Sequence, residues 1–149
     1  MEKINLNLLI QFVKKINGEH MGNLIFRYFG KGIYDAGTAG NNLTILGWFF
    51  CDVGGGGEWW KRYVSDPDNE GGGGDRTFFE KEGNNIKLNL DLLEDDFEAL
   101  VMPTSHLIEL IDQWVEIFKA RPDEIVLTER DDGTFFLRAG PYLSENNEE

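Results

Sequence analysis

The sequence predicts an α+β protein: a mostly antiparallel β-sheet packed by about two amphipathic helices, residues 5–17 and 104–120, with a C-terminal β-hairpin. In both helical segments apolar residues recur every three or four positions, the spacing of one helix face. Elsewhere, short apolar stretches alternate with clusters of Gly, Asn and Asp, which is typical of strands and turns. The length of 149 residues suits one domain, so we expect residues 1–149 to form it, with a glycine-framed insert at 54–75.

The first helix is expected over residues 5–17. Its apolar face consists of Leu8, Leu9, Phe12, Val13 and Ile16. Gly18 follows, and glycine commonly ends a helix because it adopts a left-handed backbone without strain. The opening residues, Ile4 to Leu8, alternate between apolar and polar, so the start of a strand also fits this segment.

Strands are expected next over residues 23–29 and 43–53, separated by a glycine-rich loop over residues 30–42. Both stretches are short, apolar and bounded by turn residues. Cys51 follows three aromatic residues in the second stretch, which predicts a buried and unreactive strand residue. Residues 59–64 fit either a strand or a short helix.

A hairpin is expected from strands at residues 76–82 and 86–92, joined by residues 83–85. In the second strand the apolar residues Ile86, Leu88, Leu90 and Leu92 alternate with polar ones. Because successive side chains of a strand point to opposite faces, one face of this hairpin is expected to be buried and the other solvated.

The longest helix is expected over residues 104–120. Its apolar stripe consists of Leu107, Ile108, Ile111, Trp114, Val115 and Phe118. Thr104 or Ser105 is a suitable N-terminal cap, Lys119 favours the negative end of the helix dipole, and Pro122 stops the helix.

The chain is expected to close with a second hairpin, whose strands span residues 124–129 and 134–139. The connecting residues 131–133, Asp-Asp-Gly, are typical of a hairpin turn. The acidic tail at 144–149 is expected to fray.

Two identical four-glycine runs, residues 54–57 and 71–74, enclose an aromatic and acidic segment. Glycine loses more backbone entropy on folding than any other residue, which predicts a flexible surface loop. Trp59 and Trp60 diverge in a helix or a strand, so one ring can remain at the surface as an interface anchor. Alternatively both rings pack, one under the loop and one in the core. The expected partner-binding residues are Trp59, Trp60, Tyr63, Asp66, Asp68, Glu70 and Asp75.

The acidic half of the insert has an alternative interpretation as a weak calcium site. Asp66, Asp68 and Glu70, followed by a glycine, match positions one, three, five and six of an EF-hand loop. Position twelve is Thr77 instead of the bidentate glutamate, and a surface turn explains the same residues. The glycine runs do not match a phosphate-binding loop, because an acidic residue follows each of them.

Few residues suit catalysis or zinc binding, and we expect no catalytic residue, metal or cofactor. Cys51, His20 and His106 have no spacing typical of zinc ligands. His106 falls in the first turn of the expected helix, where the dipole disfavours its protonation, although a surface histidine near a helix cap is the simpler interpretation. The alternative function is a small-ligand-binding protein or enzyme, with a glycine-rich lid over a cleft containing His106 or His20 beside buried carboxylates.

The chain has 14 basic and 27 acidic residues, a net charge of −13. Such a charge repels phosphate backbones and anionic membranes, so we expect neither nucleic acid nor membrane as a partner and favour a basic protein. Charge that only maintains solubility is the simpler explanation. The single cysteine and the lack of a signal-peptide pattern or membrane-spanning apolar run predict a soluble, cytoplasmic protein.

The last third of the chain resembles the helix-then-hairpin ending of small bacterial immunity proteins, which neutralise polymorphic or contact-dependent toxins. The resemblance covers roughly 35 residues: Met102-Pro103-Thr104-Ser105-His106-Leu107, Trp114, Pro122 to Leu127, Gly133 and Phe135. It implies an intracellular α+β protein without chemistry of its own, which binds a toxin domain and blocks its active site or substrate surface. The glycine-framed segment has no counterpart in this pattern, so no family residue is carried over to it.

Overall fold

The computed structural model describes residues 22–37, 39–91 and 97–142, and these ranges contain three helices and eight strands. In chain order the elements are β1 (Asn23–Gly30), β2 (Ile33–Ala36), α2 (Asn41–Val53), α3 (Gly57–Ser65), β3 (Gly71–Gly73), β4 (Thr77–Glu82), β5 (Asn85–Leu90), β6 (Leu100–Pro103), α4 (Thr104–Ala120), β7 (Glu124–Glu129) and β8 (Phe135–Ala139). The helix predicted over 5–17, His20, Leu92 and the acidic tail lie outside the described residues. None of the described helices combines the length and hydrophobicity needed to cross a bilayer.

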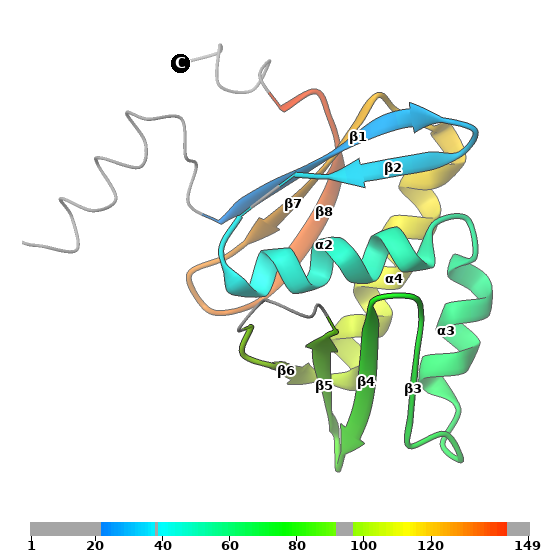
Figure 1. The fold of residues 1–149 in the computed structure, drawn as a ribbon, viewed down its shortest axis with the longest axis vertical. Helices are drawn as coiled ribbons and strands as arrows, with labels where there is room; N and C mark the ends of the chain where they lie inside the picture. Colours follow the sequence, from blue (N-terminus) through cyan, green and yellow to red (C-terminus); the bar gives the residue numbers. More distant parts are fainter. Residues whose placement is uncertain (1–21, 38, 92–96, 143–149) are drawn as a thin grey trace, which may run out of the picture.

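The strands form two antiparallel sheets, which confirms the predicted α+β class. Sheet A has the order β2-β1-β7-β8 and sheet B the order β3-β4-β5-β6. In Figure 1, α2 runs between the two sheets, α4 lies behind them, and α3 stands beside β3. Buried residues alternate along several strands, as with Leu24 and Phe26 in β1 and Ile86 and Leu88 in β5, whereas the central strand β7 buries three residues in succession. Each sheet therefore turns one apolar face toward the helices.

The segment predicted as a strand at residues 43–53 is helical and forms α2, so that prediction is wrong. Most of its residues are buried, because α2 packs against three strands of sheet A and against β4 and β5 of sheet B. A helix enclosed between two layers is apolar on most sides and lacks the periodicity of a surface helix. Gly47 allows the close approach, since a Cβ there would lie 3.0 Å from Leu24 Cδ1.

The glycine-rich loop predicted over residues 30–42 is also wrong in part, because it contains β2 and the start of α2. β2 pairs with β1 in antiparallel register, with Arg27 opposite Asp35. Three successive residues, Gly30, Lys31 and Gly32, turn the chain with φ values of 105°, 58° and 75°. The glycines thus make a tight hairpin rather than a loop.

The two predicted hairpins are confirmed. β4 pairs with β5 across a two-residue turn at Gly83 and Asn84, and β7 pairs with β8 around residues 131–133. Gly83 has a φ of 62°, the left-handed conformation that glycine adopts without strain.

Helix α4 has the predicted bounds and carries Trp114 into the core. The Trp114 ring centroid lies 5.1 Å from that of Phe26 in β1 and 5.0 Å from that of Phe50 in α2. The helix ends at Arg121, whose φ is 46°, just before Pro122. The predicted side-chain cap is wrong: the N-cap is Pro103, and no side chain makes a capping hydrogen bond.

The first glycine run forms the short turn that connects α2 to α3. Gly54 ends α2 with a φ of 48°, and its N–H donates to the carbonyl oxygen of Phe50 at 2.8 Å. Gly57 begins α3 and is buried against α4, where a Cβ would overlap Cγ2 of Val115. The lack of a side chain at Gly57 therefore allows α3 to approach α4 closely.

The second glycine run is equally constrained. Its first three residues form β3, which pairs with β4. A Cβ on Gly72 would overlap the hydroxyl of Tyr63, and a Cβ on Gly74 would lie 2.8 Å from Oδ2 of Asp52. The second run is thus mostly a strand rather than a loop, whereas residues 54–56 of the first run are a turn between two helices. The flexibility of both runs and the description of residues 54–75 as an insert stay predictions.

We expect Gly57→Ala to lower the free energy of unfolding by about 1–3 kcal/mol, the usual cost of overpacking. The new Cβ would overlap Val115, a β-branched residue with little rotamer freedom in a helix. Gly55→Ala in the same run is the matched control, because its Cβ would make an ordinary 3.5 Å contact with Phe118. Urea denaturation compares the two variants, and equal stabilities would contradict this account of the run.

Candidate partner-binding surface

Helix α3 presents Trp59 to solvent and buries Trp60, since successive side chains of a helix are rotated by about 100°. Trp59 is 52% exposed and Trp60 is 6% exposed. The Trp60 ring packs on Phe49 of α2, with ring centroids 5.4 Å apart. Of the two expectations for this pair, the structure realises the one with a single surface ring, and Trp60 is a core residue rather than a contact residue.

Tyr63 lies one helical turn after Trp59 and supports its ring. The two ring centroids are 4.6 Å apart, and the Tyr63 ring also makes an edge contact with Phe79 of β4 at 5.5 Å. Tyr63 crosses β3 at Gly72, where any side chain would overlap it. The second glycine run therefore makes room for the residue that positions Trp59.

The predicted carboxylates are exposed and occupy the two turns that flank β3. Asp66 ends α3, and its Oδ1 accepts a hydrogen bond from the N–H of Asp68 at 2.9 Å. Glu70 directly precedes β3, and Asp75 directly follows the second glycine run. We refer to Trp59, Tyr63, Asp66, Asp68, Glu70 and Asp75 together as the partner-binding surface.

The calcium alternative is not supported by this geometry. Among the described residues, no three side chains of His, Cys, Asp or Glu converge in a way that could hold a metal ion. The carboxylate of Asp66 instead fixes the backbone turn, and Lys81 donates from Nζ to the Asp66 carbonyl oxygen at 2.8 Å. Asp66, Asp68 and Glu70 are therefore turn residues, the other interpretation left open by the sequence.

An ion pair between Lys61 and Asp112 joins α3 to α4, with Lys61 Nζ and Asp112 Oδ1 2.9 Å apart. The hydrogen bond to Asp112 and the charge of that carboxylate raise the pKa of Lys61. Both side chains are substantially exposed, so solvent screens the attraction. The pair orients α3 and contributes little to stability.

A small pocket lies under the first glycine run, where the lid alternative would place a ligand. Its volume is about 130 Å³. The lining residues are Gly54, Gly55, Gly57, Glu58, Trp114, Val115, Phe118 and Lys119. Small-molecule sites usually enclose about 300–1,000 Å³. His106 does not line this pocket, and His20 lies outside the described residues, so the pocket lends no support to the predicted cleft.

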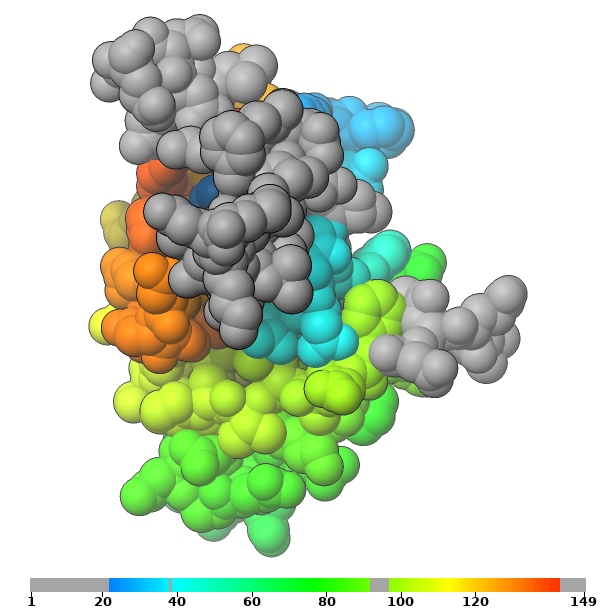
Figure 2. All heavy atoms as spheres, turned by 90° about the vertical axis from the view of Figure 1, so that its left-hand side faces the viewer, coloured from blue at the N-terminus to red at the C-terminus, as the bar shows by residue number. Residues whose placement is uncertain are grey.

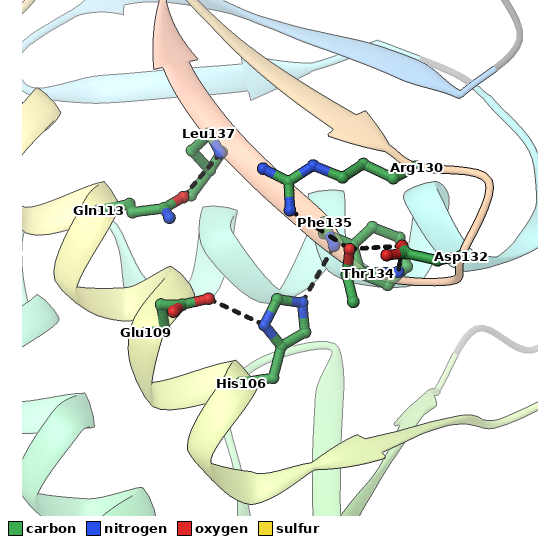
Figure 3. Close-up of polar contacts among 8 residues, drawn as sticks. All are labelled: His106, Glu109, Gln113, Arg130, Asp132, Thr134, Phe135 and Leu137. Atoms are coloured by element: carbon green, nitrogen blue, oxygen red, sulfur yellow. Dashed lines mark hydrogen bonds and ion pairs between the residues drawn. The ribbon is translucent and has the colours of Figure 1, made fainter.

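His106 connects α4 to β8 and has no free ring nitrogen (Figure 3). Nδ1 lies 3.1 Å from Oε1 of Glu109, and Nε2 accepts a hydrogen bond from the N–H of Phe135 at 3.0 Å. Only 12% of the imidazole is exposed. Because Nε2 accepts, its proton is on Nδ1, and the ring serves as a structural bridge. This geometry does not favour a role for His106 as a general base.

Gln113 repeats this arrangement two turns later on α4. Its Oε1 accepts a hydrogen bond from the N–H of Leu137 at 2.8 Å. Together His106 and Gln113 accept from two outward N–H groups of β8, one of the two end strands of sheet A (Figure 3). Figure 2 shows the β7–β8 hairpin in orange directly above the yellow-green residues of β6 and α4. This edge of sheet A is thus covered by α4.

Asp52 is a structural residue that the sequence reasoning missed. Its Oδ2 accepts hydrogen bonds from the backbone N–H groups of Arg76 and Thr77 at 3.2 and 3.1 Å, and from the Thr77 hydroxyl at 2.7 Å. The carboxylate therefore ties α2 to the turn that follows β3. No local sequence pattern reveals this contact, because 24 positions separate Asp52 from Arg76.

Cys51 lies beside Asp52 on α2. Its burial raises the pKa of the thiol to about 11, so the thiol is protonated at neutral pH and is a poor nucleophile. The prediction of a buried strand residue is met only in part, because Cys51 is partly buried and lies in a helix.

Comparison of the chain with protein-family models, curated proteins and solved structures found no match.

We expect His106→Phe to lower the free energy of unfolding by about 1–3 kcal/mol. The variant keeps a ring against Phe135 but removes the acceptor of the Phe135 N–H, and an unpaired buried donor costs about this amount. Glu109→Ala is the control, because Glu109 is exposed and its loss leaves the Nε2 contact in place. Urea denaturation at pH 8 measures both. Equal effects of the two substitutions would contradict the bridging role.

Proposed function

We propose that the chain is a non-enzymatic acidic binding protein, and specifically a cytoplasmic immunity protein that binds and neutralises a basic, nuclease-like toxin domain. The observation that carries the proposal is Trp59, a large aromatic ring that is 52% exposed on a helix anchored in the core by its neighbour Trp60. Exposed tryptophans at the centre of a surface are favoured interface anchors.

The Trp59 ring is held in place before any partner binds. Tyr63 stacks against it, and Tyr63 is itself packed between Phe79 and the backbone of β3. A side chain that is already ordered loses less conformational entropy on binding, so more of its contact energy contributes to affinity. This is the arrangement expected of a binding surface rather than of an incidental exposed residue.

The charges around Trp59 favour a basic partner. Asp66, Asp68, Glu70 and Asp75 are exposed, and the whole chain has a net charge of −13. Opposite potential accelerates association with a basic surface. A nuclease domain presents such a surface to its phosphate substrate, so an acidic protein bound there would compete with nucleic acid.

The ligand-binding or enzyme alternative lacks a comparable observation within the described residues. His106 uses both ring nitrogens for contacts within the fold, and the pocket under the first glycine run has a volume of only about 130 Å³. We therefore favour the binding protein.

Calorimetry with the basic product of a neighbouring gene tests this proposal. We expect a complex whose affinity falls by at least tenfold between 50 and 300 mM NaCl, because the attraction is screened by salt. Trp59→Ala should weaken binding by tenfold or more, since loss of a hot-spot residue costs at least about 2 kcal/mol.

Two matched controls test whether the partner binds at the partner-binding surface. Phe29→Ala removes another exposed ring, on the β1–β2 hairpin, and should leave affinity unchanged. Asp68→Lys should slow association, whereas Asp131→Lys makes the same charge change on the β7–β8 turn and should not. Failure of all neighbouring basic products to bind would contradict the proposal, as would equal effects of Trp59→Ala and Phe29→Ala.

A further inference from the structure

Among the residues that the structure describes, none pairs with the outer edge of β3, which lies beside the partner-binding surface. β3 is an end strand of sheet B. The N–H of Lys81 donates to the carbonyl oxygen of Glu70 at 2.7 Å, and the N–H of Gly74 donates to that of Thr77 at 2.8 Å. Hydrogen-bonded positions alternate along an antiparallel pair, so residues 70, 72 and 74 face β4. Gly71 and Gly73 therefore direct their N–H and C=O groups away from the sheet.

The outer edges of β8 and β3, which are end strands of sheets A and B, are covered to different extents. On β8 of sheet A, the outward N–H groups of Phe135 and Leu137 are occupied by side chains of α4. On β3, Gly71 and Gly73 are exposed and have no side chains to shield the backbone. Proteins usually blunt or cover a free sheet edge, so an uncovered one is a site where another strand can pair.

We propose that the β3 edge binds an extended segment of the basic partner by strand addition, an inference that rests on the proposed function. Side chains of an added strand would alternate between the two faces of sheet B. One face presents Tyr63 over Gly72, with Trp59 beside it. The other presents Phe78, which lies opposite Gly73 and is 40% exposed.

The carboxylates around the β3 edge favour a basic segment as its partner. Glu70 and Asp75 flank the two ends of the second glycine run, and Glu80 lies opposite Gly71; all three are exposed. Two neighbouring cations make contacts within the fold. Lys81 binds the Asp66 carbonyl, and the guanidinium of Arg76 lies over the Trp48 ring. Lysines or arginines spaced along an added strand would thus meet carboxylates at both ends of β3.

Amide hydrogen exchange by NMR, with an eight-residue peptide of alternating valine and lysine, tests the inference. We expect the peptide to slow exchange at Gly71 and Gly73 by at least tenfold and to leave Gly72, which already pairs with β4, nearly unchanged. A peptide N-methylated at alternate residues keeps the charge but cannot pair along one edge, so it should give no protection. A valine–glutamate peptide should not bind.

Two protein variants separate the backbone contact from side-chain effects. Gly73→Pro removes a backbone N–H that does not pair with β4. Gly73→Ala keeps this N–H and adds a Cβ as proline does, 3.0 Å from the Cβ of Phe78. Only the proline variant should lose protection at Gly71 by the valine–lysine peptide. Equal binding of the N-methylated peptide, or binding without protection at Gly71 and Gly73, would overturn the inference.

The same readout distinguishes this inference from the proposed function. A basic protein that binds through Trp59 without protecting Gly71 and Gly73 would overturn strand addition and support the proposed function. Protection by the valine–lysine peptide, with no neighbouring basic protein bound, would support a strand-binding edge and contradict the proposed immunity role.

Discussion

The hydrogen bond from the Trp114 indole to the carbonyl oxygen of Gly54, 2.8 Å long, is the contact on which the arrangement of the other elements depends. Trp114 is fully buried and packs on Phe26 of sheet A and Phe50 of α2. The indole N–H must find an acceptor in this apolar surrounding, and the carbonyl at the end of α2 provides one. One side chain thus fixes α4 against sheet A, against α2 and against the first glycine run.

The two glycine runs follow from that packing. Trp114 brings α4 into contact with the end of α2, and three residues later Gly57 lets α3 begin directly against Val115 of α4. At the other end of α3, Gly72 and Gly74 let the chain pass beneath Tyr63 and against Asp52. The entropy lost by ordering the glycines is offset by contacts that no other residue permits. The surface around Trp59 is therefore joined to the core through Trp60, Tyr63 and the packed glycines.

The sequence predicted those parts of the fold whose burial is one-sided. α4 shows a clear apolar stripe because its other face meets solvent, and β5 alternates because one face of sheet B is open. α2 was missed because layers on both sides bury Leu43, Phe49 and Phe50 and erase the period. The divergence of Trp59 and Trp60 was predictable from helix geometry, but which ring points inward depended on Phe49. The partners of the glycines, Val115, Tyr63 and Asp52, are brought together only by folding.

The most direct test of this account is the ¹⁵N relaxation of the glycine amides, since each gives its own NMR signal. The packing described above predicts order parameters of about 0.85 at Gly57 and Gly72, equal to those within α4. Gly83, whose added Cβ would meet nothing within 4 Å, provides a reference in a turn without packing contacts. Order parameters below about 0.6 throughout both runs would show a flexible segment and would contradict the account.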